Sequence, residues 1–429
     1  MKEQFISELE RHFTSNLDGI SPLQKAIREK AWEQFLAKGL PNKKFAGYQY
    51  FPFSHFYQES YELASLPSIP EEQIQSLIHH ECRRSYVIFV NGQYVPELSN
   101  VSGLPEEVVV LRLRDALADY GNFLQMRLAR AMKEEADPFA ILNTALIQMG
   151  LFLYIPPKIV IDTPIQCLHI ISDDHAVLFN PRIHFFLGKQ AKVKWIYDHH
   201  CLKDFEYFSN GVIDIALEEG AHFEQYGILN PCHNGWCFEA TRATLKRDST
   251  FKSITYTTGT KSVRQDFRIS LLGENTFCDL KGLAMLSENR QAHVNVTMDH
   301  AAERSTSNQL FKNVLADAAR ASFEGKIHVH SKAQKTQAYQ LNNNLLLSDR
   351  AVANCKPNLE IFADDVKASH GATTAQQNPE HIFYLKTRGV DPKLAKLLLL
   401  SGFCMDILKE ISFLPVRERM QQLVEKFLK

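Results

Sequence analysis

Histidine and cysteine residues supply the groups in this sequence whose types and spacing fit metal chemistry. Imidazole nitrogen and thiolate sulfur are donors that zinc and iron take in proteins. Two clusters offer both donors: His199-His200-Cys201, and the later set Cys232, His233 and Cys237. The Cys-His-x₃-Cys spacing is not one of the usual zinc spacings, and only three donors lie within reach. The pattern therefore favours paired or buried thiols near a turn over a metal site.

A second histidine pair alternates along one expected strand. Side chains two residues apart share a face of a strand, so His328 and His330 face one side, while Ile327 and Val329 face the core. Two imidazoles on an outer face can hold a metal ion. A solvated strand face is the simpler interpretation, and we keep both.

One histidine stands in the small, polar end of the segment 358–374. His370 is followed by Gly371, which leaves the ring accessible in an expected turn. An unperturbed imidazole is mostly neutral near pH 7, as metal ligation requires. One histidine cannot complete a tetrahedral iron or zinc site, so other donors would have to come from elsewhere, such as another chain. The residues alone favour a junction histidine that bonds a backbone carbonyl.

Common catalytic motifs are absent from the sequence. It contains no G-x-x-x-x-G-K-[ST], no G-x-G-x-x-G, no H-E-x-x-H and no G-x-S-x-G. The string 258–262 (TGTKS) lacks the glycines of a phosphate-binding loop. An ATPase, a Rossmann oxidoreductase, a zincin and an α/β-hydrolase are each disfavoured.

Composition excludes several further classes. The 429 residues include 48 Lys plus Arg and 49 Asp plus Glu, for a net charge of −1, which gives no bulk attraction to nucleic acid or membranes. Hydrophobic residues at 45% exclude a disordered chain. The N-terminus lacks the apolar stretch of a signal peptide, and no apolar run is long enough for a membrane span. We therefore expect a cytoplasmic protein whose eight scattered cysteines are mostly reduced and buried.

The elements that must position these groups fall into three regions. Residues 1–150 are expected to be mostly helical, with a short strand segment at 86–110. Ser21-Pro22 and Gly39 predict the start and end of one helix, and Asn91-Gly92 predicts a hairpin. The aromatic stretch 48–57 is interpreted as a plug that packs helices onto the next layer.

Residues 151–374 are expected to be a β-solenoid, although the period alone leaves a sandwich or barrel open. Short apolar-alternating strands recur at roughly 8 to 15 residues, polar residues recur inside them, and few hairpin turns join neighbours. A glycine beside an acid is expected to mark the turns, at Glu219-Gly220, Gly273-Glu274 and Glu324-Gly325.

Residues 375–429 are expected to be helical. Starts are predicted at Asn378-Pro379, at Asp391-Pro392 and at Pro415, and ends at Gly389 and Gly402. Helices after a solenoid would cover the strand edges of its last coil and offer a groove or ridge to a partner.

A β-helix polysaccharide lyase or hydrolase is the alternative from the enzyme class. Such an enzyme needs paired acids or carboxylate-held calcium. The candidate acids Glu218 with Glu219, and Asp364 with Asp365, are adjacent in sequence. Adjacent side chains on a strand point to opposite faces, which argues against a shared catalytic pair.

A series of short segments runs in order along nearly the whole chain, as in one known protein family. The first are 39–44 (GLPNKK), 90–96 (VNGQYVP), 140–145 and 155–157. The C-terminal third adds 307–310, 323–327, 334–336, 344–348, 356–361 and 365–373 (DVKASHGAT). On these segments the chain resembles the SufB/SufD family of the SUF iron–sulfur cluster assembly system.

The resemblance implies a right-handed parallel β-helix with helical ends. It further implies a non-enzymatic scaffold in a complex with SufB and two copies of the ATPase SufC. SufB would face the last β-helix coils, and SufC would dock on the C-terminal helices. The interface residues expected from this resemblance are Asp365, Lys367, Ser369, His370, Leu394, Leu397 and Leu398.

The resemblance also bears on cofactors. His370 matches the family histidine that faces a SufB cysteine, which implies a transient iron or cluster ligand there. Ala368 stands where some members carry Cys, and this favours the SufD branch over a cluster-carrying SufB-like scaffold. No tightly bound cofactor is expected in the lone chain, and flavin binding in the complex is left open. Without SufB, the chain could form a homodimer through the same surface.

Overall fold

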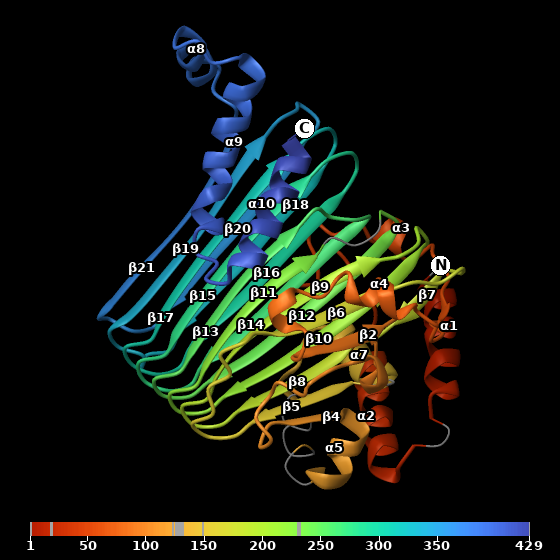
Figure 1. Ribbon diagram of the computed structural model, residues 1–429. Helices are drawn as coiled ribbons and strands as arrows, with labels where there is room; N and C mark the ends of the chain where they lie inside the picture. Colours follow the sequence, from red (N-terminus) through yellow and green to blue (C-terminus); the bar gives the residue numbers. More distant parts are fainter. Residues whose placement is uncertain are drawn as a thin grey trace.

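Two long sheets, stacked face to face, form the body of the molecule (Figure 1). The computed structural model describes residues 2–17, 20–121, 124, 133–147, 150–229 and 233–428. Most neighbouring strands are parallel, and the chain alternates between the two sheets in a β-solenoid of about eight turns. The expected mainly β fold with helical ends is therefore confirmed.

Each sheet takes every second strand of the solenoid. Sheet A contains β1 (Glu62–Leu63), β4 (Val109–Arg112), β5 (Leu151–Ile155), β7 (Val177–Phe179), β8 (Arg182–Leu187), β10 (Tyr207–Leu217), β12 (Gly235–Leu245), β14 (Ser262–Leu271), β16 (Gln291–His300), β18 (Arg320–Val329) and β20 (Val352–Ile361). Sheet B contains β2 (Tyr86–Val90), β3 (Gln93–Tyr94), β6 (Ile165–Ile171), β9 (Lys192–Cys201), β11 (His222–Leu229), β13 (Thr250–Thr257), β15 (Phe277–Leu286), β17 (Thr306–Leu315), β19 (Thr336–Leu346) and β21 (Val366–Gln376).

A column of left-handed residues marks the turn from sheet A to sheet B in seven successive coils. Its members are Lys158, Gln190, Gly220, Asp248, Asn275, Arg304 and Lys335. Each donates its backbone N–H to a carbonyl of the next coil, as in Gly220 to Arg247 (2.9 Å). The expected glycine-and-acid turn is confirmed at Gly220, and Gly273 lies in the turn that ends at Asn275.

The third expected turn, at Glu324-Gly325, is wrong, because Gly325 lies inside β18. A Cβ at this position would collide with the side-chain amide of Gln340. The glycine is therefore required for space in the interior and not for a turn.

The helices lie outside the two sheets (Figure 1). They are α1 (Lys2–Ser15), α2 (Pro22–Lys38), α3 (Phe53–Phe56), α4 (Glu71–Gln75), α5 (Leu113–Asp119), α7 (Pro138–Leu146), α8 (Pro379–Thr387), α9 (Pro392–Leu408) and α10 (Leu414–Leu428), with short 3₁₀ turns at His80–Cys82 and Pro96–Leu98. No helix in these described ranges is long and apolar enough to cross a bilayer.

Local sequence signals in the N-terminal region are confirmed. Ser21 caps α2 in a capping box with Gln24, and Gly39 ends that helix with φ +70°. Asn91 and Gly92 both have positive φ and join β2 to β3 in an antiparallel hairpin.

The aromatic plug is also confirmed. Phe51 and Phe56 pack on Trp236 and Phe238 of sheet A, with ring centroids 5.0 to 5.6 Å apart. This cluster fixes the N-terminal helices to the outer face of sheet A.

The C-terminal helices differ from the expectation in two ways. Gly402 lies inside α9 and does not end it. The helices also lie along the outer face of sheet B instead of closing the last coil: Leu400, Ile407 and Met420 join the core formed with Tyr256 and Met285. The strand edge at the C-terminal end of the solenoid therefore stays uncovered by them, while α8 projects away from the sheets (Figure 1).

Candidate functional site

The last coil is an open strand edge. β20 and β21 each pair with only one strand along the sheet, and almost every residue of β21 is exposed or half-buried. His370 lies within β21, in register with Gln340 of β19. The expected turn at His370 is therefore wrong, since the strand runs on to Gln376. Asp365, which precedes the strand, is also exposed.

Strand alternation sorts the residues around His370. Ala368 packs on the interior core, so His370 follows the same inward-facing row, while Lys367 and Ser369 face outward. The His370 ring is exposed and makes no hydrogen bond with any residue that the structure describes. The expected bond to a backbone carbonyl is thus not made.

Sequence reasoning missed Cys355 on β20, the strand of sheet A that precedes β21 in the last coil. Its Sγ lies 2.8 Å from Asn342 Oδ1 and 3.2 Å from Asn344 Nδ2. Six of the described cysteines are free thiols, and Cys355 is the one that is not buried. Burial still raises the pKa of its thiol, and the Asn344 contact opposes this. The open coil therefore presents a thiol as well as an imidazole. The signal in the sequence was the alternation of 352–361, which puts position 355 on the interior side.

The adjacent histidines of the first cluster point to opposite sides of sheet B. His200 faces outward, where its Nε2 lies 3.0 Å from Asp198, which also pairs with Arg419 of α10 (2.9 Å). His199 faces the interior and stacks on His169 with ring centroids 4.7 Å apart. The two histidines therefore do not share a site.

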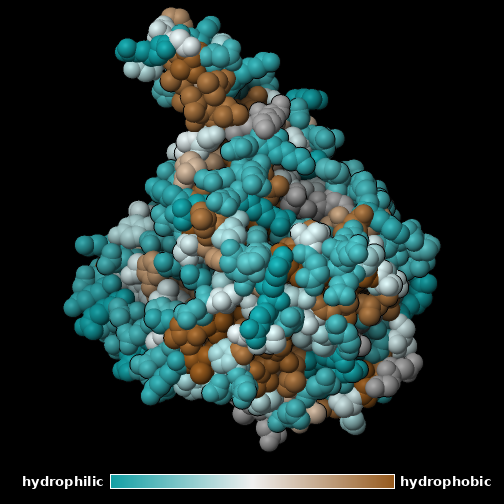
Figure 2. All heavy atoms as spheres, in the orientation of Figure 1, coloured by the Kyte–Doolittle hydropathy of each residue, from teal (hydrophilic) through white to brown (hydrophobic). Residues whose placement is uncertain are grey.

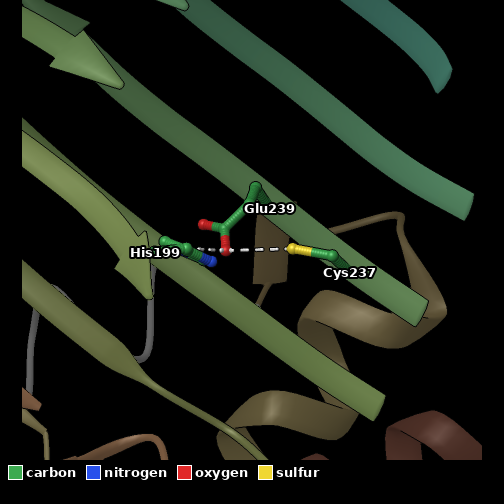
Figure 3. A group of neighbouring side chains, drawn as sticks. All are labelled: His199, Cys237 and Glu239. Atoms are coloured by element: carbon green, nitrogen blue, oxygen red, sulfur yellow. Dashed lines mark hydrogen bonds and ion pairs between the residues drawn. The ribbon is translucent and has the colours of Figure 1, made fainter. Parts of the chain in front are cut away.

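The interior brings His199 together with two residues of sheet A (Figure 3). Glu239 Oε1 lies 3.5 Å from His199 Nε2 and 3.7 Å from Cys237 Sγ. All three side chains are buried. Of the second sequence cluster, His233 is exposed in a turn, and Cys232 lies outside the described residues. Glu239 was missed by sequence reasoning because glutamate inside a solenoid has no local signal.

Burial keeps these groups uncharged. It raises the pKa of Glu239 to about 8, and it raises the pKa of the Cys237 thiol well above its ordinary value. Burial, with a smaller effect of His169, holds the pKa of His199 well below its usual range. Near pH 7 the set is therefore mostly a carboxylic acid, a thiol and a neutral imidazole.

The second histidine pair shares one carboxylate on the outer face of sheet A. His328 Nδ1 and His330 Nε2 lie 2.8 and 2.9 Å from Asp299 Oδ1, on β16. The expectation that both rings face one side is thus confirmed, and all three side chains are half-exposed. Asp299 holds the two rings by hydrogen bonds, and the three ligand atoms also lie close enough together to hold a metal ion, so both interpretations of the pair stay open.

An exposed apolar strip lies on the projecting helices. Figure 2 shows hydrophobic atoms gathered on the part of the molecule that carries α8 and α9. Its residues are Phe383, Tyr384, Leu394 and Leu398, each about half or more exposed. Leu397 is half-buried on the same helix. Contiguous exposed apolar residues mark protein contacts in soluble proteins.

The fold and its open coil define a class of protein, the β-solenoid with helical regions at both ends. The chain belongs to the SufBD family: the profile for "SUF system FeS cluster assembly, SufBD core domain" matches residues 169–403, and the profile for "SufBD protein N-terminal region" matches residues 1–167. The resemblance seen in the sequence is therefore confirmed.

Curated relatives carry the same assignment over most of their length. The chain is 29% identical over 401 residues to the iron–sulfur cluster assembly SufBD family protein slr0076 of Synechocystis, covering 90% of this chain and 87% of that protein. It is 28% identical over 381 residues to SufD of Escherichia coli (87% and 86%) and 22% identical over 415 residues to SufD of Bacillus subtilis (94% of each). These similarities support a role in iron–sulfur cluster assembly by the SUF system.

The lyase alternative loses its support. Glu218 and Glu219 form ion pairs with different lysines, Lys246 (2.8 Å) and Lys189 (3.3 Å), in a surface turn. The two carboxylates therefore do not form the pair that a glycan-cleaving enzyme needs. Family membership accounts for the solenoid without glycan chemistry.

Proposed function

We propose that the chain is a non-enzymatic scaffold subunit that pairs with a SufB-type protein through its last coil and docks a SufC-type ATPase on its C-terminal helices. Iron entry or cluster formation takes place at the SufB contact, with His370 as a transient ligand. The observation that carries this proposal is the uncovered strand edge at β20 and β21, which holds an exposed imidazole without a hydrogen-bond partner among the described residues.

The edge supports pairing because an unpaired strand edge is a template for another chain. β21 contains eleven residues, long for an edge that nothing covers. Lys367 and Ser369 face outward beside His370 and supply polar contacts at the rim. One imidazole cannot complete a tetrahedral metal site, so the remaining ligands come from the partner.

The apolar strip on α8 and α9 supports the second contact. Leu394 and Leu398 are exposed on the same helix whose Leu400 and Ile407 are buried against sheet B. One face of α9 therefore anchors the helix, and the other is free for an ATPase partner. The sequence has no phosphate-binding loop, so ATP hydrolysis in the complex belongs to that partner.

Co-expression tests the proposal. The full chain, tagged at its N-terminus, is purified with untagged SufB and SufC from the same source, and iron, acid-labile sulfide and flavin are measured. A ternary complex carrying iron and sulfide is expected. A chain that purifies alone, or as a homodimer that excludes SufB, contradicts the proposal.

A further inference from the structure

We propose that His199, Cys237 and Glu239 form a metal site inside the solenoid, and that it binds one zinc ion in tetrahedral coordination. This site is separate from the open last coil, because β9 and β12 lie several coils before β20 and β21. Its ligands come from β9 of sheet B and β12 of sheet A, so an ion there joins the two sheets across the interior (Figure 3).

The distances fit tetrahedral zinc. Zinc bonds of roughly 2.0 to 2.3 Å at tetrahedral angles place a nitrogen and an oxygen ligand about 3.3 Å apart, and a sulfur and an oxygen about 3.6 Å apart. The observed separations are 3.5 Å for His199 Nε2 to Glu239 Oε1 and 3.7 Å for Cys237 Sγ to Glu239 Oε1. The third pair, His199 Nε2 and Cys237 Sγ, lies within 4.8 Å, so these two atoms draw closer together when the ion binds.

Buried polar atoms without hydrogen bonds also lie at this proposed metal site. Both ring nitrogens of His199 are buried without a hydrogen-bond partner in the described structure, although the ring is 1% exposed. Buried polar groups are normally satisfied, so an orphaned imidazole calls for a ligand. Ser209 is the register neighbour of Cys237, and its hydroxyl is likewise buried without a partner. A fourth ligand, from Ser209 or a water, would complete the set.

The backbone leaves room for the carboxylate. Gly211 is the register neighbour of Glu239, and a Cβ there would stand only 3.0 Å from Glu239 Oε2. The lack of a side chain at this position lets Glu239 lie over the neighbouring strand and turn toward His199. Zinc would displace the protons of the Cys237 thiol and the Glu239 carboxyl to solvent as it binds, and the resulting thiolate and carboxylate, with the neutral imidazole of His199, are donors that zinc accepts.

The test uses the full chain without a histidine tag, produced in zinc-supplemented medium and analysed by elemental mass spectrometry. About one zinc ion per chain is expected after EDTA treatment, because all three ligands are buried. Cys237→Ala and Glu239→Gln should each lower the zinc content roughly tenfold or more. Cys278→Ala, which removes another buried thiol of the same interior, and the double variant His328→Gln/His330→Gln should keep it.

Cobalt provides a second measurement on the unaltered chain. Protein produced with cobalt should show a thiolate-to-cobalt charge-transfer band, which Cys278→Ala keeps and Cys237→Ala loses. The band of the unaltered chain tests for a thiolate ligand even where a variant fails to fold, and its absence would contradict the proposal. Wild-type protein without bound metal, zinc retained in Cys237→Ala, or iron in place of zinc would each overturn the proposal.

Discussion

His370 and Gln340 occupy the same register position on neighbouring strands, yet Gln340 is 2% exposed and His370 is exposed. The contrast arises because β19 has a strand on both sides, whereas β21 is the last strand of sheet B. An identical position in the coil is thus interior for one residue and open to a partner for the other. The exposure of His370 therefore depends on where the solenoid stops.

The first prediction concerns His370. His370→Ala should leave the complex with SufB and SufC intact, because the exposed ring makes no hydrogen bond or ion pair with the residues that the structure describes. Cluster content should fall severalfold, measured as iron and sulfide per complex after co-expression. The matched control is His175→Ala, which removes an exposed loop histidine far from His370 in the sequence. Full cluster content in His370→Ala would contradict the proposed role of His370 as a ligand.

The second prediction concerns the apolar strip on α9. Leu394→Asp and Leu398→Asp should weaken SufC binding roughly tenfold or more, because charge is placed in an apolar contact. Calorimetric titration with SufC measures the effect. Deleting the helices is a poorer test, since Leu400 and Ile407 belong to the core. Leu66→Asp, at an equally exposed leucine of the N-terminal region, should bind normally. Unchanged affinity in both α9 variants would place the SufC contact elsewhere.

The third prediction concerns acid stability. Burial lowers the pKa of His293 to about 3, aided by Arg264, and it lowers the pKa of His300 to about 4 against the opposing effect of Asp299. As pH falls below the unfolded value of about 6.5, the unfolded state takes up these protons first. The stabilisation is therefore complete above about pH 6.5 and is lost progressively toward pH 4.

Denaturant titrations at pH 7.5 and pH 5 measure this loss. Each histidine should contribute about 2 kcal/mol to the difference in the free energy of unfolding. His300→Gln should show a smaller difference between the two pH values than the wild type, whatever its absolute stability. An equal or larger difference in this variant would contradict the assignment.

The fourth prediction concerns the buried ion network beneath the N-terminal helices. Asp266 lies between Arg242 (2.6 Å) and Arg264 (3.3 Å). Burial opposes its ionisation, but the two guanidinium groups outweigh burial and hold its pKa well below the usual range. Asp266→Asn leaves buried arginines short of a counter-charge and should cost about 3 to 5 kcal/mol. Asp248→Asn, in a surface turn, should change stability little in the same unfolding experiment.

The sequence was informative where a structural signal is local. The Ser21 cap and the Asn91-Gly92 hairpin depend on a few consecutive residues, and both are present. The prediction that a helix ends at Gly402 was wrong, because an isolated glycine occurs both at the ends of helices and inside them, where packing tolerates it.

The interior cluster could not be predicted, for a physical reason. His199 and Glu239 meet because of the register between coils and the facing of two sheets, neither of which a short pattern specifies. His199 and His200 looked like one site in the sequence, but strand alternation separates them. The exposure of His370 likewise depends on the absence of a following coil and not on its neighbours in sequence.

The column of left-handed turn residues has a consequence for how the chain can change in length. Because each turn bonds only to the turns before and after it, the solenoid resembles a one-dimensional stack. Inserting a single residue would shift the register of the interior-facing side chains beyond it. Duplicating one whole coil would keep these side chains in register. Growth or shortening by complete coils would therefore move the partner-binding end along the axis without altering its chemistry.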